Sequence, residues 1–199
     1  RLVELRDDDD LVEANLRHAF DQRPKSERIA RLLEDFARDR GRNPALVDAL
    51  LRLASLDAAP MAMLREAWEV ASDDGDDARA GAALERGVAA APGEDDPAGE
   101  ERASWAFLGL AERSRVAGDL ARATDLWERA ARVALGDEAR ELLLRAADAA
   151  ENGLSDPRRA AGIYEKLRER EPGDRAIWVP LAACHRKLGD DAALVTLLE

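Results

Sequence analysis

The spacing of helix breakers limits the folds open to this chain more than any other pattern in it. A glycine or serine followed by aspartate recurs between helical stretches, at Gly75-Asp76, Gly118-Asp119, Ser155-Asp156 and Gly189-Asp190. The intervals are 43, 37 and 34 residues, and Gly41 precedes Gly75 by another 34. Glycine adopts the left-handed conformation that ends one helix, and the aspartate after it can cap the next. This period predicts stacked units, each of which buries its apolar face against a neighbour.

The stretches between the breakers have the apolar spacing of helices. Apolar and small residues recur at intervals of three and four, as in Phe107, Leu110, Ala111, Ser114 and in Leu143, Ala146, Ala147, Ala150. β-Branched residues are sparse, and no long stretch alternates apolar and polar residues. Helix-forming Ala, Leu, Arg and Glu dominate instead. The sequence therefore predicts an all-α protein whose helices are short, about 10–16 residues each.

The repeat resembles the tetratricopeptide repeat, a helix–turn–helix unit with the pattern W-x2-L-G-x2-Y, then A-x3-F, then P. The resemblance covers residues 61–199 well and residues 1–60 loosely. It implies a right-handed α-solenoid of about five hairpins and roughly eleven helices, forming a single domain over residues 1–199. The matching residues in the last three units are Trp178, Leu181, Ala182, His185, Leu194 and Leu198; Leu143, Ala146, Ala147, Ala150, Ala160, Tyr164 and Pro172; and Phe107, Leu110, Ala111, Ser114, Ala123 and Trp127.

Large and small residues alternate between the two helices of a unit. The pattern places Trp127 against Ala111 and Tyr164 against Ala147, so each large side chain is expected to fill the gap left by a small one. The acidic stretch 93–100 contains glycine and proline, and we expect it to form a joint. The chain begins with arginine and ends within an apolar pattern, which suggests a fragment of a longer, bacterial protein.

Charge and composition exclude several classes of function. The chain has 30 basic and 42 acidic residues and a net charge of −12, which argues against nucleic acid as a partner. No uncharged apolar run approaches the roughly 18 residues that a membrane span needs. The single cysteine, Cys184, excludes an internal disulfide framework. The prediction is a cytoplasmic protein.

Residues suited to catalysis or metal binding are scarce. The two histidines, His18 and His185, are far apart in the sequence. Cys184 is next to His185, but neighbouring helical residues point about 100° apart and form a poor nucleophile–base pair. Acidic clusters at 7–10, 73–77 and 94–96 lack the ligand spacing of a calcium loop. We expect them to cap helices, and we predict no enzyme activity, cofactor or metal site.

The candidate binding residues lie beside the packing stripe on the first helix of each hairpin. In proteins with this repeat those helices line a concave groove, so the resemblance implies that these positions face a partner. Leucine, valine and tryptophan would form an apolar strip edged by acids, which suits an apolar peptide with basic flanks. An alternative for Trp105 is packing against the joint at 93–100. The candidate residues are Arg65, Glu69, Trp105, Leu108, Glu112, Arg115, Leu144, Asp148, Val179 and Arg186.

Two functional hypotheses follow. The first is a non-catalytic scaffold that binds a peptide or partner domain in the groove. The alternative is a structural module that self-associates through its exposed faces. Members of the family that bind a C-terminal carboxylate use Asn and Lys at the groove positions, and the acids Glu69, Glu112 and Asp148 here would repel such a ligand.

Overall fold

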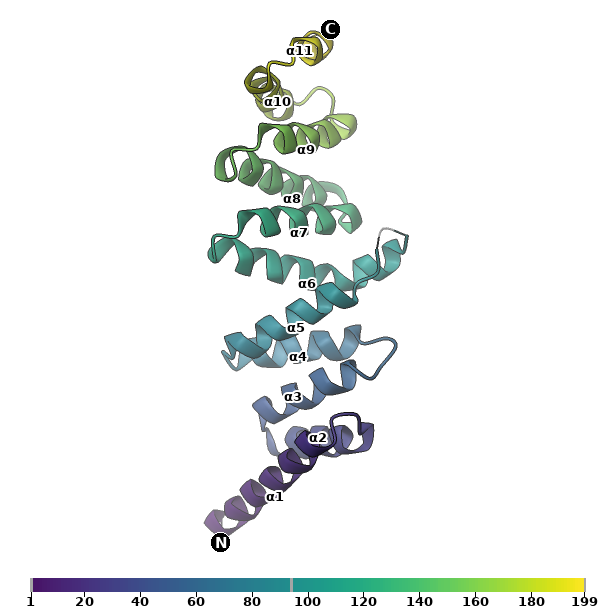
Figure 1. The fold of residues 1–199 in the computed structure, drawn as a ribbon, viewed down its shortest axis with the longest axis vertical. Helices are drawn as coiled ribbons and strands as arrows, with labels where there is room; N and C mark the ends of the chain where they lie inside the picture. Colours follow the sequence, from purple (N-terminus) through teal and green to yellow (C-terminus); the bar gives the residue numbers. More distant parts are fainter. Residues whose placement is uncertain (1, 94, 199) are drawn as a thin grey trace. The chain divides into compact units, whose positions relative to one another are not determined.

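The computed structural model describes residues 2–93 and 95–198 of the chain and divides into two compact units, residues 1–91 and 92–199. The described residues form eleven α-helices and one short π-helical turn, η1, and contain no β-strand (Figure 1). Unit 1 contains α1 (Leu2–Gln22), α2 (Glu27–Arg40), α3 (Asn43–Ala54), α4 (Met61–Asp73) and α5 (Asp77–Ala90). Unit 2 contains α6 (Pro97–Val116), α7 (Leu120–Val133), α8 (Gly136–Asp148), η1 (Ala149–Gly153), α9 (Pro157–Arg170), α10 (Arg175–Leu188) and α11 (Asp191–Leu198).

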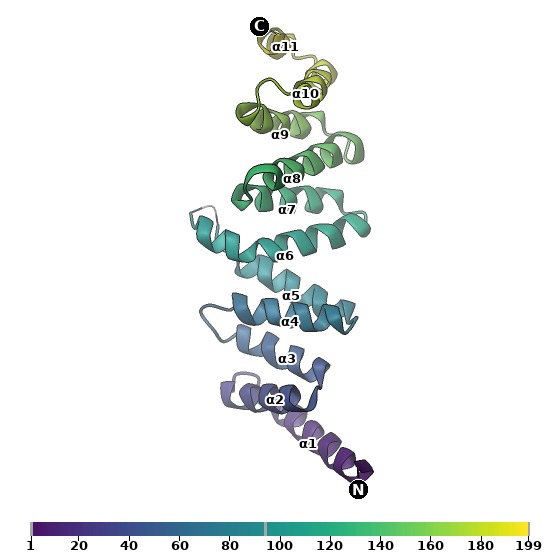
Figure 2. The ribbon, with the colours of Figure 1, turned by 180° about the vertical axis from the view of Figure 1, so that it is seen from behind.

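Within each unit every helix packs against the helix that follows it in the sequence. Unit 1 stacks the hairpins α2–α3 and α4–α5 after α1, and unit 2 stacks α6–α7, α8–α9 and α10–α11 (Figure 2). The fold is thus an all-α solenoid of helix–turn–helix hairpins, as the sequence predicts. No helix among the described residues has both the length and the apolar character needed to cross a bilayer.

The hairpin turns have the conformation that the breaker pattern predicts. Gly75, Gly118 and Gly189 have φ values of 73°, 82° and 69°, in the left-handed region. Ser155 takes the same conformation, with φ at 53°, although it carries a side chain. The aspartate after each of these residues caps the next helix: Asp76, Asp119, Asp156 and Asp190 accept backbone N–H bonds from Arg79, Arg122, Arg159 and Ala193.

One acidic cluster corrects the sequence prediction. The run at 7–10 does not cap a helix, because α1 continues through it; the side chain of its first residue lies outside the described part. Asp9 and Asp10 instead bind Arg40 and Arg42, at the end of α2 and the start of α3. The nearby guanidinium groups offset the repulsion between neighbouring carboxylates, so the helix does not need to end there.

The predicted joint at 93–100 is partly helical. Helix α6 begins at Pro97, and Asp96 caps it by accepting the backbone N–H of Gly99. Glu100, in the first turn, is only 2% exposed and accepts hydrogen bonds from Arg129 and Arg132 on α7. These contacts fasten the start of α6 to the end of α7.

Candidate functional site

Two cavities in unit 2 lie between α6 and α8, each also lined by α7. Both are lined by one side of α6, where residues 101, 104, 108, 112 and 115 recur at helical spacing. The smaller, which we call the apolar cleft, has a volume of about 230 Å³ and is lined by Glu101, Ser104, Leu108, Ala130, Val133, Ala134, Leu135, Glu138 and Leu142. The larger, which we call the charged cavity, has a volume of about 530 Å³ and is lined by Glu112, Arg115, Leu120, Trp127, Arg145, Asp148, Ala149 and Gly153.

The apolar cleft combines hydrophobic side chains with two acidic ones. Leu108 and Leu142 come from α6 and α8, and Leu135, between α7 and α8, is 85% exposed. Glu101 and Glu138 are exposed, and neither has an ion-pair partner within the described ranges. The cleft therefore offers an apolar surface next to two carboxylates that can attract a cation.

An ion pair on α6 and a side-chain hydrogen bond at the end of α8 border the charged cavity. Arg115 donates two hydrogen bonds to Glu112, at 2.9 and 2.5 Å, and these bonds lower the pKa of the Glu112 carboxyl. On α8, Asp148 accepts a hydrogen bond from Asn152 at 2.7 Å. Trp127, which is 5% exposed, supplies an aromatic part of the lining. A ligand here would meet charges of both signs next to an aromatic ring.

The wall formed by η1 was not predicted from the sequence. In three other hairpins the backbone N–H of the capping aspartate donates to the carbonyl five residues earlier, as Asp119 does to Ser114. The N–H of Asp156 instead donates to the carbonyl of Ala150, six residues earlier. One extra residue is thus absorbed as a π-turn, a feature frequent at functional sites. The sequence contains the signal: Ser155 comes 12 positions after Leu143, whereas Gly118 comes 11 positions after Phe107.

Gly153 lies close to the side chain of Leu120, which would have to move to make room for a larger residue here. A Cβ atom on Gly153 would lie 2.4 Å from the Cδ1 atom of Leu120, the first residue of α7. Both residues line the charged cavity. The π-turn that holds the extra residue therefore packs against α7 at the edge of the charged cavity.

Four candidate residues line the two cavities. Leu108 lines the apolar cleft, and Glu112, Arg115 and Asp148 line the charged cavity. The hairpin geometry brings these residues together because α6 and α8 are the first helices of successive hairpins.

The other six candidates lie outside these cavities. Trp105 on α6 and Leu144 on α8 are half-buried. Val179 and Arg186 are exposed on α10. Arg65 and Glu69 pair with each other on α4, in unit 1, with 2.9 Å between Nε and Oε1.

The groups with the greatest potential for catalysis are poorly placed for it. Cys184 is fully buried, and this burial raises the pKa of its thiol, so the reactive thiolate is disfavoured. His185 is also buried, with its ring nitrogens 3.7 Å from Glu165 and 3.9 Å from Asp190. Within residues 2–93 and 95–198, no three His, Cys, Asp or Glu side chains are grouped as metal ligands.

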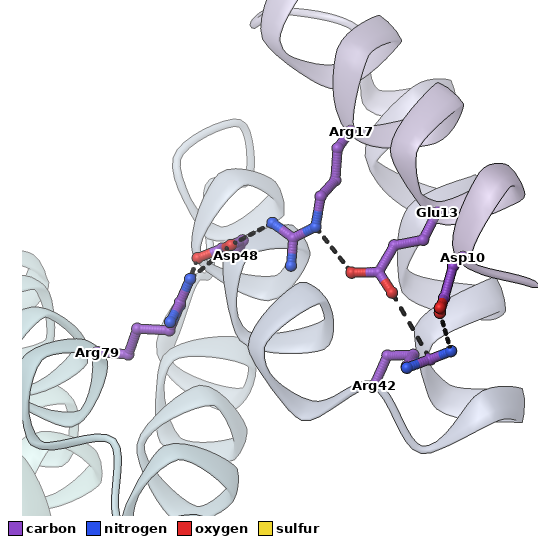
Figure 3. Close-up of polar contacts among 6 residues, drawn as sticks. All are labelled: Asp10, Glu13, Arg17, Arg42, Asp48 and Arg79. Atoms are coloured by element: carbon purple, nitrogen blue, oxygen red, sulfur yellow. Dashed lines mark hydrogen bonds and ion pairs between the residues drawn. The ribbon is translucent and has the colours of Figure 1, made fainter. Parts of the chain in front are cut away.

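Unit 1 contains a second polar arrangement that sequence reasoning missed. Arg17 of α1, Asp48 of α3 and Arg79 of α5 form a ladder across three helices (Figure 3). The Asp48 carboxylate lies 2.9 Å from Arg17 and 2.7 Å from Arg79. These residues are spaced at 31-residue intervals. That regular interval was the available signal.

Comparison with known proteins finds a likeness among solved structures only. No family model matches the sequence, and no curated protein matches it. The crystal structure of the MamA protein is similar, with a TM-score of 0.39 and 16% sequence identity, over 86% of this chain and 87% of that one.

Proposed function

We propose that this chain is a non-catalytic protein-interaction scaffold that binds a peptide or partner domain on the α6–α8 surface of unit 2. The observation that supports it best is the single stripe on α6 that lines both cavities. Consecutive residues of such a stripe can contact a bound segment over several turns of the helix. The remaining candidates on α10, Val179 and Arg186, would extend this surface, and those on α4 would serve as a separate contact.

The chemistry of the apolar cleft suggests what binds there. Leu108, Leu142 and Leu135 would contact an apolar side chain, while Glu101 and Glu138 would attract a neighbouring lysine or arginine. The partner proposed is therefore an apolar segment with basic flanks. The proposal includes a cytoplasmic location, with which a single buried, reduced cysteine is compatible.

A displayed peptide library tests the specificity. Selection on the unmodified protein should enrich apolar residues next to Lys or Arg, because the cleft pairs leucines with free carboxylates. Enriched peptides should lose binding to the Glu101→Lys, Glu138→Lys variant.

The matched control is Asp39→Lys, Asp73→Lys, which makes the same change of charge at exposed sites in unit 1. It should bind the peptides like the parent. Equal loss in both variants would show that only net charge matters, and enrichment of no such motif would refute the partner chemistry.

Self-association is the alternative function, and exposed apolar residues favour it. Leu11 on α1 is 62% exposed and Val195 on α11 is 57% exposed, so both helices present apolar surface. Light scattering across a wide range of protein concentration separates the two functions. A scaffold should keep the mass of one chain, whereas an assembling module should grow in mass as the concentration rises.

A further inference from the structure

A cation occupies the same position in four helices of the repeat. The tenth residue after the cap position is Arg52 in α3, Arg86 in α5, Arg129 in α7 and Lys166 in α9. Because the hairpins repeat, these four side chains have equivalent places on their helices. Their partners can therefore be compared directly within one molecule.

In unit 2 both of these cations bind a glutamate. Arg129 donates to Glu100 at 3.2 Å, and its guanidinium lies 4.3 Å from the centre of the Phe107 ring. Lys166 donates to Glu128 at 3.0 Å. A carboxylate is thus the regular partner of this position in unit 2.

In unit 1 the equivalent arginines donate their hydrogen bonds, among the described residues, to backbone carbonyls. Arg52 donates to the carbonyl of Phe20 at 3.3 Å and lies over the Phe20 ring, 4.0 Å from its centre. Arg86 donates to the carbonyl of Leu51 at 2.8 Å. Within the part of the chain that the structure describes, neither arginine has a carboxylate partner. One carbonyl satisfies only part of a guanidinium group that has five N–H donors.

Both arginines line the same pocket, which has a volume of about 290 Å³ and lies among α1, α3 and α5. The lining also includes Arg17, Asp21 and Asp48. The Asp48 carboxylate is already paired with Arg17 and with Arg79, which is not part of the lining. Figure 3 shows the ladder that Arg17, Asp48 and Arg79 form. Among the lining residues three arginines face two aspartates, so positive charge is in excess there, although the chain as a whole has a net charge of −12.

We infer that this pocket binds the carboxylate of a glutamate side chain from a partner protein. The supplied carboxylate would give Arg52 and Arg86 the kind of partner that Arg129 and Lys166 have in unit 2. Arginine suits this ligand because its planar donors match the two carboxylate oxygens. Phe20 and Leu51 in the lining would contact the methylene groups of the glutamate. The site lies in unit 1, so it does not depend on peptide binding in unit 2.

Nuclear magnetic resonance of the whole chain tests the inference through the arginine Nε–Hε signals. The probes are the blocked peptide acetyl-Gly-Gly-Glu-Gly-Gly-amide, the same peptide with Gln in place of Glu, and inorganic phosphate. The Glu peptide should shift the signals of Arg52 and Arg86, and the Gln peptide should not. Equal shifts with both peptides, or shifts with phosphate alone, would overturn the assignment.

Substitutions locate the site. Arg52→Gln, Arg86→Gln should weaken binding of the Glu peptide about tenfold or more, which corresponds to about 1.4 kcal/mol per tenfold. Arg86→Gln alone should weaken it in the same direction, and because Arg86 is exposed this variant should keep the parent's thermal midpoint. The control Arg23→Gln, Arg28→Gln removes the same charge at exposed positions of unit 1 and should leave binding unchanged. Equal weakening in the control would refute a specific site.

Discussion

The large and small residues that the repeat pattern pairs in the α6–α7 and α8–α9 hairpins are all buried. Ala111 and Ala147 are fully buried on α6 and α8, and Trp127 and Tyr164 are buried on the helices that follow. Alanine lets two helices approach closely, and the large ring fills the space on either side. In Tyr164 the burial of the ring also raises the phenol pKa to about 12, so the hydroxyl stays neutral.

Truncation of Trp127 should be strongly destabilising. Trp127→Ala should lower the free energy of unfolding by about 3–5 kcal/mol, because the ring is only 5% exposed and its loss leaves a cavity. Denaturant unfolding measures the change. The control Leu135→Ala removes a side chain that is 85% exposed and should change stability by about 0.5 kcal/mol or less. Similar values for both variants would contradict this account of the core.

The buried carboxylate of Glu100 should also contribute to stability. Glu100→Gln keeps the shape of the side chain but weakens the bonds from Arg129 and Arg132, which should cost about 1–3 kcal/mol. Thermal unfolding gives the magnitude. An unchanged midpoint would mean that the cost of burying the charge cancels its bonds to the two arginines.

The turns of the α4–α5, α6–α7, α8–α9 and α10–α11 hairpins each combine one residue in the left-handed conformation with one aspartate cap. This part of the structure follows directly from local sequence, because glycine conformation and aspartate capping involve only neighbouring residues. Ser155 has the left-handed conformation although it is not a glycine, and its position in the repeat still predicts the turn. Short-range chemistry therefore sets where the helices of these four hairpins meet.

Two glycines should respond to alanine in opposite ways. Gly118→Ala should destabilise by about 1–2 kcal/mol, because its φ of 82° is strained for any residue with a Cβ atom. Gly162→Ala lies within α9, where a Cβ would meet nothing within 4 Å, and should stabilise by about 0.5–1 kcal/mol. Thermal unfolding of both variants should show midpoints on opposite sides of the parent. A shift in the same direction would contradict the turn geometry.

The candidate sites were only partly predictable. Helical spacing placed Leu108, Glu112 and Arg115 on one side of α6, because that periodicity is local. The cavities themselves require side chains from three helices, and their depth depends on packing that spacing does not determine. The hydrogen bonds from Arg52 and Arg86 to backbone carbonyls could not be predicted either, because the sequence shows a cation but not its partner.

Across the chain, ion pairs link helices that are not consecutive. In unit 1 the ladder joins α1, α3 and α5, and in unit 2 Arg159 of α9 binds Asp125 and Glu128 of α7. Single exposed pairs contribute little to stability, but connected networks contribute more. Within each unit, ion pairs at the surface therefore connect the stacked helices in addition to the apolar contacts in the core.

Stability should fall in acid. The backbone N–H and the guanidinium of Arg79 lower the pKa of Asp76, and the N–H of Ala176 together with Arg140 lowers that of Asp174. A lowered pKa in the folded state stabilises the protein above the unfolded value, near 3.8 for aspartate, and this contribution is lost as the pH falls through the folded value. Thermal midpoints should hold near pH 7 and drop progressively below about pH 4.

The control for the acid prediction is Asp76→Asn, which keeps a capping oxygen but cannot titrate. Its thermal midpoint should depend less on pH than that of the parent. An identical pH profile would remove Asp76 from the explanation.

The π-turn at Ala149–Gly153 has a consequence for how such an array can change over time. An added residue usually shifts everything after it, yet here α9 is still capped by Asp156 in the regular way. The length change is confined to one hairpin end, where it also shapes a wall of the charged cavity. A repeat protein of this kind can acquire a new recess by insertion while its neighbouring repeats keep their pairing.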